Sequence, residues 1–233
     1  MNRKTVLITG SSRGLGRELA LVFSRECYNI IINGRNEDGL KKTEKEVSKN
    51  GVNCYSVLGD LRDEETISRL YNYAKDSDLS VLINNAGIST HLTSFNDISI
   101  KDLEEVLDIN LIAPIRLTKR IYPLFLEKGS GCVININSIL GLEPRNLKVD
   151  YCSAKWGLRG FTASLRLEAK KDNIRIIGVY PTRIKTKPEF EYGMDPYKVA
   201  MEIHNAYKNG SPDFLVLDKR PKEFKLKRTE EYG

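Results

Sequence analysis

The stretch TVLITGSSRGLGRELA, residues 5–20, decides the fold. Its first five residues are β-branched or leucine and indicate a buried strand, which runs directly into a glycine-rich turn. Apolar residues then recur at helical spacing, at Leu15, Leu19, Val22 and Phe23. A strand, a glycine turn and a helix in this order open a βαβ unit. The backbone amides at the start of such a helix can hold a pyrophosphate, although an ordinary flexible turn is the alternative and the spacing departs from G-x-G-x-x-G.

The rest of the chain alternates short β-branched runs with longer amphipathic stretches. Strands are predicted at 5–9, 29–33, 52–60, 79–87, 131–138, 174–181 and 213–218. The helices that follow the first one are predicted at about 37–49, 63–75, 99–127, 150–171 and 196–208. Strands separated by helices indicate right-handed crossovers and a parallel sheet covered on both faces, in one α/β domain over residues 1–233.

Composition narrows the function classes. Of the 233 residues, 37 are basic and 31 acidic, and the net charge of +6 is spread along the chain. Nucleic-acid binders usually gather their basic residues on one face, so no nucleic-acid partner is expected. The nearest basic run, Lys219 to Arg228, is broken by Glu223. We interpret about 219–233 as a polar, solvated tail, with an interaction tail as the alternative.

The four cysteines and two histidines do not have the spacing of a metal site, so no metal is expected. Free thiols favour a reducing, cytoplasmic location. The N-terminus enters a strand almost at once, which leaves no room for a signal peptide, and no apolar run reaches the ~20 residues of a membrane span. No membrane partner is therefore expected.

The end of the second predicted strand bears on the choice of dinucleotide. An acidic residue usually stands there to hold the ribose 2′-hydroxyl of NAD, but this chain has Asn33, Gly34 and Arg35. Arg13, in the glycine turn, is a second cation near the same ribose. Two guanidinium groups suit a 2′-phosphate and therefore favour NADP(H). The alternatives are that both arginines are merely solvated, or that the acidic residues at 37 and 38 weaken this preference for NADP(H) over NAD.

DYCSAK, residues 150–155, places Tyr151 and Lys155 on one face of a helix. A free phenol has a pKa near ~10, and a nearby ammonium should lower it, so the pair predicts a proton-transfer residue. A tyrosine packed beside a solvated lysine is the ordinary alternative. Ser138, at the carboxyl end of the fifth strand, is placed to polarise a substrate carbonyl beside the tyrosine.

TGSSRGLG, NNAG, the Ser138–Tyr151–Lys155 spacing and PTRIKT together resemble the short-chain dehydrogenase/reductase family, over about residues 4–186 and more weakly to 218. The resemblance implies a three-layer Rossmann-type fold with a doubly wound parallel sheet of about seven strands. It also implies a homodimer or homotetramer, and hydride transfer between a nicotinamide and a carbonyl or alcohol carbon.

The resemblance also assigns roles to individual residues. Tyr151 would be the acid/base, Lys155 would lower its pKa and hold the nicotinamide ribose, Ser138 would orient the carbonyl oxygen, and Asn110 would support a proton-relay water. The expected cofactor contacts, besides Tyr151 and Lys155, are Gly10, Ser12, Arg13, Gly14, Leu15, Gly16, Arg35, Asp60, Leu61, Asn84, Ala86, Gly87, Pro181, Ile184 and Thr186. Asp60 matches the residue that contacts the adenine.

The sequence departs from the family at two places. Thr182 stands where a glycine usually follows Pro181, so the loop there is expected to have a different shape. The segment between Thr186 and the next helix is short, which implies an open site or a substrate carried by something larger. The expected substrate residues are His91, Ser138, Leu140, Arg145, Tyr151 and Arg183. Lys148, Lys185 and Lys187 would extend them into a cationic rim for an anionic substrate, with scattered surface charge as the alternative.

The leading hypothesis is an NADPH-dependent oxidoreductase that acts on a carbonyl or secondary alcohol. A 3-oxoacyl-thioester reductase, with the substrate on an acyl-carrier protein or coenzyme A, would share every motif. A catalytically silent NADP-binding regulatory protein is the hypothesis from another class. The presence of all four catalytic positions argues against it, although a fold alone does not establish activity.

Overall fold

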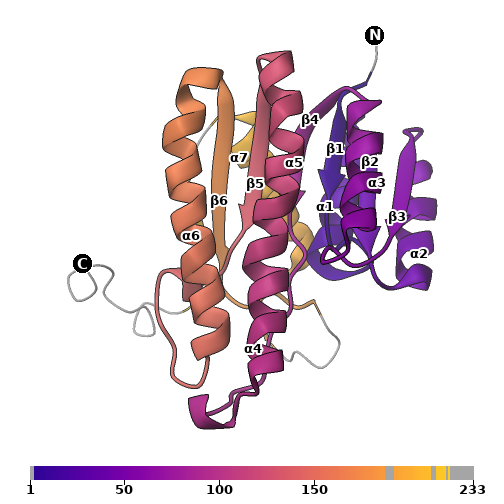
Figure 1. Cartoon of the computed structure of the whole chain (residues 1–233). Helices are drawn as coiled ribbons and strands as arrows, with labels where there is room; N and C mark the ends of the chain where they lie inside the picture. Colours follow the sequence, from indigo (N-terminus) through magenta and orange to yellow (C-terminus); the bar gives the residue numbers. More distant parts are fainter. Residues whose placement is uncertain (1–2, 187–191, 211–213, 219, 221–233) are drawn as a thin grey trace.

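A computed structural model of the chain describes residues 3–186, 192–210, 214–218 and 220, and shows a central sheet between two layers of helices (Figure 1). Lys187 of the expected substrate rim and most of the expected tail lie outside the described residues. The strands are β1 (Thr5–Ile8), β2 (Asn29–Gly34), β3 (Cys54–Leu58), β4 (Leu79–Asn84), β5 (Gly131–Ile136), β6 (Ile174–Pro181) and β7 (Phe214–Leu217).

The seven strands form one sheet in the order β3-β2-β1-β4-β5-β6-β7, and every neighbouring pair is parallel. This confirms the predicted fold class. The chain winds outward from β1 to β3 and then returns to place β4 on the other side of β1. Ligands of doubly wound sheets bind in the crevice at the carboxyl ends of the strands on either side of such a reversal.

Helices cover both faces of the sheet, as Figure 1 shows. They are α1 (Gly14–Arg25), α2 (Glu37–Ser48), α3 (Glu64–Lys75), α4 (Ile100–Leu107), α5 (Ala113–Lys128), α6 (Val149–Ala169) and α7 (Pro196–Lys208). Alternate strand residues enter two separate cores. Val6 and Ile8 of β1 pack with α1 and α7, whereas Leu7 packs with α3 and α5. This alternation explains why the strands read as continuous apolar runs.

The single helix predicted at 99–127 is interrupted. Between α4 and α5 the backbone widens into a π-helical turn at Asp108–Ile112. Pro114, in the first turn of α5, has no amide hydrogen with which to bond the carbonyl of Asn110, so the α-helical hydrogen-bond ladder cannot continue through this point. Turns of this kind often occur at functional sites, and this one holds Asn110.

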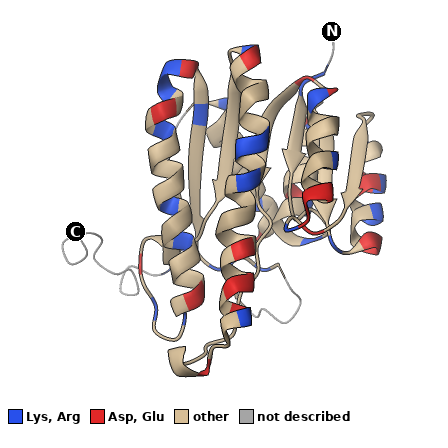
Figure 2. Ribbon diagram, viewed as in Figure 1, with Lys and Arg blue, Asp and Glu red and all other residues tan. Residues whose placement is uncertain are grey.

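Charges of both signs cover the viewed face of the molecule. Figure 2 shows acidic residues along α4 and residues of both signs along α5 and α6, so the basic residues are not gathered in one place. Among the described residues, no helix is long and apolar enough to cross a membrane.

Candidate active site

Three segments that are far apart in the sequence bring the predicted catalytic residues together at the carboxyl edge of the sheet. Ser138 follows β5, Tyr151 and Lys155 lie near the start of α6, and Asn110 lies in the π-helical turn. Ser138 lies beside Tyr151, and its hydroxyl acts to lower the pKa of the phenol. The ammonium of Lys155 lies 5.5 Å from the centre of the Tyr151 ring. The structure therefore groups a hydroxyl, a phenol and a cation at one place.

The electrostatics of this pair differ from the sequence-based expectation. Burial raises the pKa of Tyr151 to about 12, and the thiol of Cys152 adds to the rise, while the hydroxyl of Ser138 acts in the opposite direction. Burial also lowers the pKa of Lys155 to about 8. The expected lowering of the tyrosine pKa by Lys155 is therefore not found in the protein alone: burial disfavours the phenolate and sets the direction of the shift.

Lys155 and Asn110 are both held by backbone groups. Lys155 is 3% exposed, and its Nζ donates a hydrogen bond of 3.2 Å to the carbonyl oxygen of Ile136. The side-chain amide of Asn110 donates to the carbonyl oxygens of Ile88 (3.1 Å) and Val106 (3.0 Å). Asn110 therefore ties the loop after β4 to the π-helical turn, a positioning contact that the sequence did not predict.

Gly87 lies where this loop passes closest to the site. A Cβ atom at Gly87 would come within 2.8 Å of Asn110 Oδ1 and 3.9 Å of Lys155 Nζ. A side chain here would press on the asparagine and begin to fill the space beside the lysine. The glycine thus keeps open the approach to Lys155, which is where a nicotinamide ribose is expected.

Asn137 is a positioning residue that sequence reasoning missed. It is 4% exposed and lies directly before Ser138. Its Oδ1 accepts from the backbone amide of Ser138 at 2.9 Å, and its Nδ2 donates to the backbone carbonyl of Lys155 at 3.1 Å. One side chain thereby couples the exit of β5 to α6. The only signal in the sequence was a polar residue at the end of an apolar strand.

The glycine turn leaves the start of α1 open. The residue before this helix, Arg13, has an extended backbone and makes no side-chain cap, and the first turn contains no acidic residue. In contrast, α2 and α7 are capped by the side chains of Asn36 and Asp195. The uncapped amides and the partial positive charge of the helix end therefore remain available to an anion such as a pyrophosphate.

The turn is also closely packed against the loop after β6. Gly14 has φ = +57°, and a Cβ there would lie 2.9 Å from the Cβ of Thr186. Leu15 is buried, so its contact with a ligand would be through its backbone. The structure thus places Thr186, expected at the nicotinamide end, beside the expected pyrophosphate site.

The two asparagines of the NNAG segment, residues 84–87, make different contacts. The side chain of Asn84 is 3% exposed and donates to Thr118 Oγ1 (2.9 Å) and Asn135 Oδ1 (2.8 Å), so it faces the core and not the cofactor crevice. The cofactor contact that was expected of Asn84 therefore has to come from its backbone. The side chain of Asn85 instead donates to the carbonyl oxygen of Thr9 at 2.8 Å and fixes the glycine turn.

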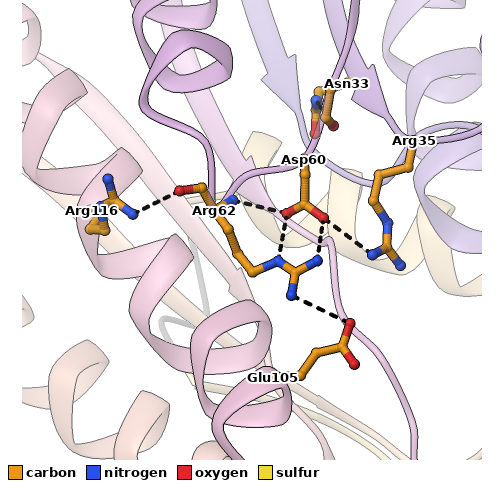
Figure 3. A network of polar contacts seen from close by, with 7 residues as sticks. Asn33, Arg35, Asp60, Arg62, Glu105 and Arg116 are labelled. Atoms are coloured by element: carbon orange, nitrogen blue, oxygen red, sulfur yellow. Dashed lines mark hydrogen bonds and ion pairs between the residues drawn. The ribbon is translucent and has the colours of Figure 1, made fainter. Parts of the chain in front are cut away.

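A charged network occupies the expected adenine end of the crevice (Figure 3). Arg62 donates three hydrogen bonds to the carboxylate of Asp60, from Nε (3.2 Å), NH2 (2.9 Å) and its backbone amide (2.9 Å). Arg35 donates to the same carboxylate at 3.2 Å. Although burial acts the other way, Arg62 and then Arg35 hold the pKa of Asp60 below its ordinary value. The carboxylate therefore remains charged and fixed, while Arg35 is left largely exposed.

The network extends to the helices. Arg62 lies 3.5 Å from Glu105 of α4, and Arg116 of α5 donates to the carbonyl oxygen of Arg62 at 3.1 Å. The role of Arg62 was not predicted. Glu37, one of the two acidic residues in the alternative to a clear NADP(H) preference, pairs with Lys41 at 2.7 Å. Arg13 is exposed, so both arginines predicted for a 2′-phosphate have guanidinium groups that a ligand can reach.

The loop after β6 accommodates threonine without left-handed backbone. Thr182 is not among the described residues with positive φ, and its amide donates to the carbonyl oxygen of Leu217 at 2.9 Å. Pro181 pairs with Leu217 in the β6–β7 register. Ile184 forms an isolated bridge with Met194, and Arg183 stacks on the ring of Tyr192 at 4.3 Å. The loop is therefore held to β7 by a backbone bond that does not depend on the threonine side chain.

The expected cationic rim is only partly exposed. His91, Arg145, Arg183 and Lys185 are exposed, and Leu140 is half-buried. Lys148, however, is 7% exposed, and its ammonium donates to the backbone oxygen and hydroxyl of Thr90. Burial lowers the pKa of Lys148. Lys148 thus joins two loops of the substrate wall and is not an open anion-binding group. The described residues contain no cluster of three or more metal-ligating side chains.

Comparison with known proteins agrees with this geometry. The family model described as short chain dehydrogenase matches residues 4–193. The chain is 31% identical over 226 residues to the ketoacyl reductase HetN of Nostoc sp., which covers 91% of this chain and 78% of the relative. It is 30% identical over 217 residues to an NADP-dependent 3-hydroxy acid dehydrogenase of Schizosaccharomyces pombe, and this match covers 91% of this chain and 82% of the relative.

Solved structures show the same fold at lower identity. The alcohol dehydrogenase of Comamonas testosteroni, described as specific for bulky-bulky ketones, superposes with a TM-score of 0.87 at 22% identity, over 96% of this chain and 89% of that one. A short-chain dehydrogenase of Sphingobium yanoikuyae, solved in complex with NADPH, superposes with a TM-score of 0.83 at 23% identity. This match covers 92% of this chain and 87% of that one. With the family model matching most of its length, this chain is a member of the short-chain dehydrogenase family.

Proposed function

We propose that this protein reduces a carbonyl group to a secondary alcohol with NADPH, and that Tyr151 donates the proton. The observation that carries the proposal is the grouping of Tyr151, Ser138 and Lys155 at the carboxyl edge of the sheet. With a pKa of about 12, the phenol is protonated near neutral pH, which is the form that reduction requires. Ser138 can hydrogen-bond the same carbonyl oxygen and stabilise the charge that develops on it.

The cofactor supplies the hydride when it is bound, and the chain has groups that suit each of its parts. The uncapped start of α1 suits the pyrophosphate, and Lys155 suits the nicotinamide ribose beside Gly87. Arg13 and Arg35 suit a 2′-phosphate, and Asp60 and Leu61 are expected to contact the adenine. Ala86 lies beside Gly10 and Thr186 beside Gly14, which supports their expected contacts with the cofactor, and Ile184 is expected to join them. One relative is named as NADP-dependent, which supports the same choice of cofactor.

A 3-oxoacyl thioester is the second candidate substrate. Relatives that carry the name 3-oxoacyl-acyl-carrier-protein reductase FabG are 32–34% identical to this chain, and the Nostoc relative is named a ketoacyl reductase. A substrate attached to a carrier needs an open entrance, and the short segment between Thr186 and the start of α7 is consistent with that requirement.

The test is the rate of cofactor oxidation by the purified protein. The panel contains simple ketones, diketones, keto sugars, phosphorylated ketones and a 3-oxoacyl thioester, each with NADPH and with NADH. The proposal expects turnover with NADPH on at least one class, and the thioester arm separates the two candidate substrates. Tight NADPH binding without turnover on any class would instead favour a binding protein.

A further inference from the structure

An ion-pair cluster joins the loop after Ser138 to the segment after β7. Glu143, five positions beyond Ser138, has a side chain that is only 5% exposed. Its Oε2 accepts a hydrogen bond of 2.9 Å from NH2 of Arg220. Arg220 was expected to lie in a solvated tail, but its side chain is 29% exposed and held at this point.

Asp218 fixes the arginine from the other side. It accepts hydrogen bonds from Nε, NH2 and the backbone amide of Arg220, each at 3.0 Å. Asp218 directly follows Leu217, whose carbonyl accepts from the amide of Thr182. The cluster therefore lies at the carboxyl edge of β6 and β7, the edge of the sheet that also holds Ser138.

Glu143 depends on this arginine. Its second oxygen, Oε1, is buried and has no hydrogen-bond partner within the described part of the chain. A buried carboxylate with one oxygen unpaired retains a large desolvation cost, and removal of its cation would leave the charge wholly uncompensated. Without Arg220, the loop would have to move to return Glu143 to water.

The far end of the same loop is held independently. Lys148 bonds Thr90, and the amide of Thr93 donates to the carbonyl oxygen of Leu147 at 3.1 Å. These contacts do not involve Glu143. The end next to Ser138 is a single 3₁₀ turn, Ile139–Gly141, so the contact with Arg220 bears most directly on that end.

We propose that Arg220 is a positioning residue: through Glu143 it holds residues 139–143, which contain Leu140 of the expected substrate wall, in the conformation that completes the substrate site beside Ser138. This inference rests on the proposed function for its consequence in catalysis. The latch itself, defined as Glu143, Asp218 and Arg220, is a structural claim that can be tested without any substrate.

The first test is amide hydrogen exchange in the full-length chain. Arg220→Ala should make exchange in residues 139–143 at least about tenfold faster, while β1 and β4 are unchanged. In a Glu143→Gln background the same substitution should have less than about a threefold effect, because the neutral amide no longer needs the cation. Lys208→Ala, which breaks the exposed Lys208–Glu26 pair, is the matched control and should not affect this loop.

The second test is kinetic. Arg220→Ala should raise KM for the carbonyl substrate about tenfold and leave KM for NADPH within about twofold, and Arg220→Lys should recover part of the loss. Unchanged exchange in 139–143, equal effects in both backgrounds, or faster exchange with an unchanged substrate KM would each overturn the proposal. If the wild type reduces no carbonyl, the proposed function fails, and the exchange experiment still decides whether the latch exists.

Discussion

The ammonium of Lys155 lies 5.5 Å from the centre of the Tyr151 ring, and burial moves the two pKa values toward neutral forms of both groups. The phenol, with a pKa of about 12, keeps its proton near neutral pH. The amine, with a pKa of about 8, remains mostly cationic there. The protein alone is therefore prepared to donate a proton from Tyr151, whereas alcohol oxidation needs the phenolate and would gain from alkaline pH.

Replacement of Tyr151 by phenylalanine removes the hydroxyl proposed as the proton donor and retains the ring. We expect kcat to fall by a factor of about 10²–10⁴, the usual contribution of a positioned general acid. The dissociation constant for NADPH should stay within about threefold, because the ring is retained. Stopped-flow reduction and fluorescence titration of NADPH measure the two quantities. Reduction at the wild-type rate would show that another group supplies the proton.

The lowered pKa of Lys155 predicts a pH-dependent stability. The folded-state pKa of about 8 lies below the ordinary value of 10.5, so the unfolded chain binds more protons between these values and stability rises with pH across that window. This increase in stability is complete above pH 10.5 and is lost as the pH falls to about 8. Relative to Lys155→Met, the free energy of unfolding of the wild type should therefore rise by up to roughly 3 kcal/mol between these two pH values.

Urea unfolding of both proteins at a pH just below 8 and again near 9.5 measures this effect without a substrate. Comparison with Lys155→Met cancels the titration of other groups, including Tyr151, whose own raised pKa acts at higher pH. A constant difference between the two proteins would mean that the buried amine has an ordinary pKa.

Arg35 is expected to set cofactor preference, because it lies on Asp60 with half of its side chain exposed. Arg35→Ala should weaken the binding of NADPH about tenfold, as expected for the loss of one charge-assisted hydrogen bond. The affinity for NADH should remain nearly unchanged. Arg62→Ala is the informative partner variant. Because Arg62 fixes Asp60, its loss should weaken the binding of both NADPH and NADH. Equal effects of Arg35→Ala on the two cofactors would refute its contact with the 2′-phosphate.

The architecture was predictable because each strand and helix follows a local pattern. β6 begins and ends where its apolar run does, and the strand–turn–helix at 5–20 led directly to the uncapped start of α1. Tyr151 and Lys155 were found for the same reason, since a spacing of four residues is a property of one helix.

What the sequence could not reveal depends on contacts between distant segments. Arg62 was overlooked because its contacts with Glu105 of α4 and Arg116 of α5 join segments that are far apart in the sequence. Arg220 was assigned to a tail because nothing local indicates Glu143, which lies 77 positions earlier. The pKa of Tyr151 was expected to be lowered because the sequence shows the neighbouring cation but not the extent of burial. In each case a long-range contact or desolvation outweighed the local pattern.

Asn137 provides a sharp test of positioning, because the chain contains a matched control two residues away. Asn137→Ala breaks the bonds to the amide of Ser138 and the carbonyl of Lys155. Asn135, also buried, makes two comparable bonds to Asn84 and Thr162 deeper in the sheet. Both alanine variants should lose about 1–3 kcal/mol of stability, the cost of stranding buried polar groups.

Only Asn137→Ala should impair chemistry in the folded enzyme. We expect its kcat to fall roughly 10- to 100-fold with KM for NADPH little changed, since a misplacement of about 1 Å can cost that much. Asn135→Ala should keep kcat once the folded fraction is accounted for. Equal losses of kcat in both variants would show that Asn137 serves general packing. A loss confined to Asn137→Ala would show that the distance between Ser138 and Lys155 is set by this side chain and is required for turnover.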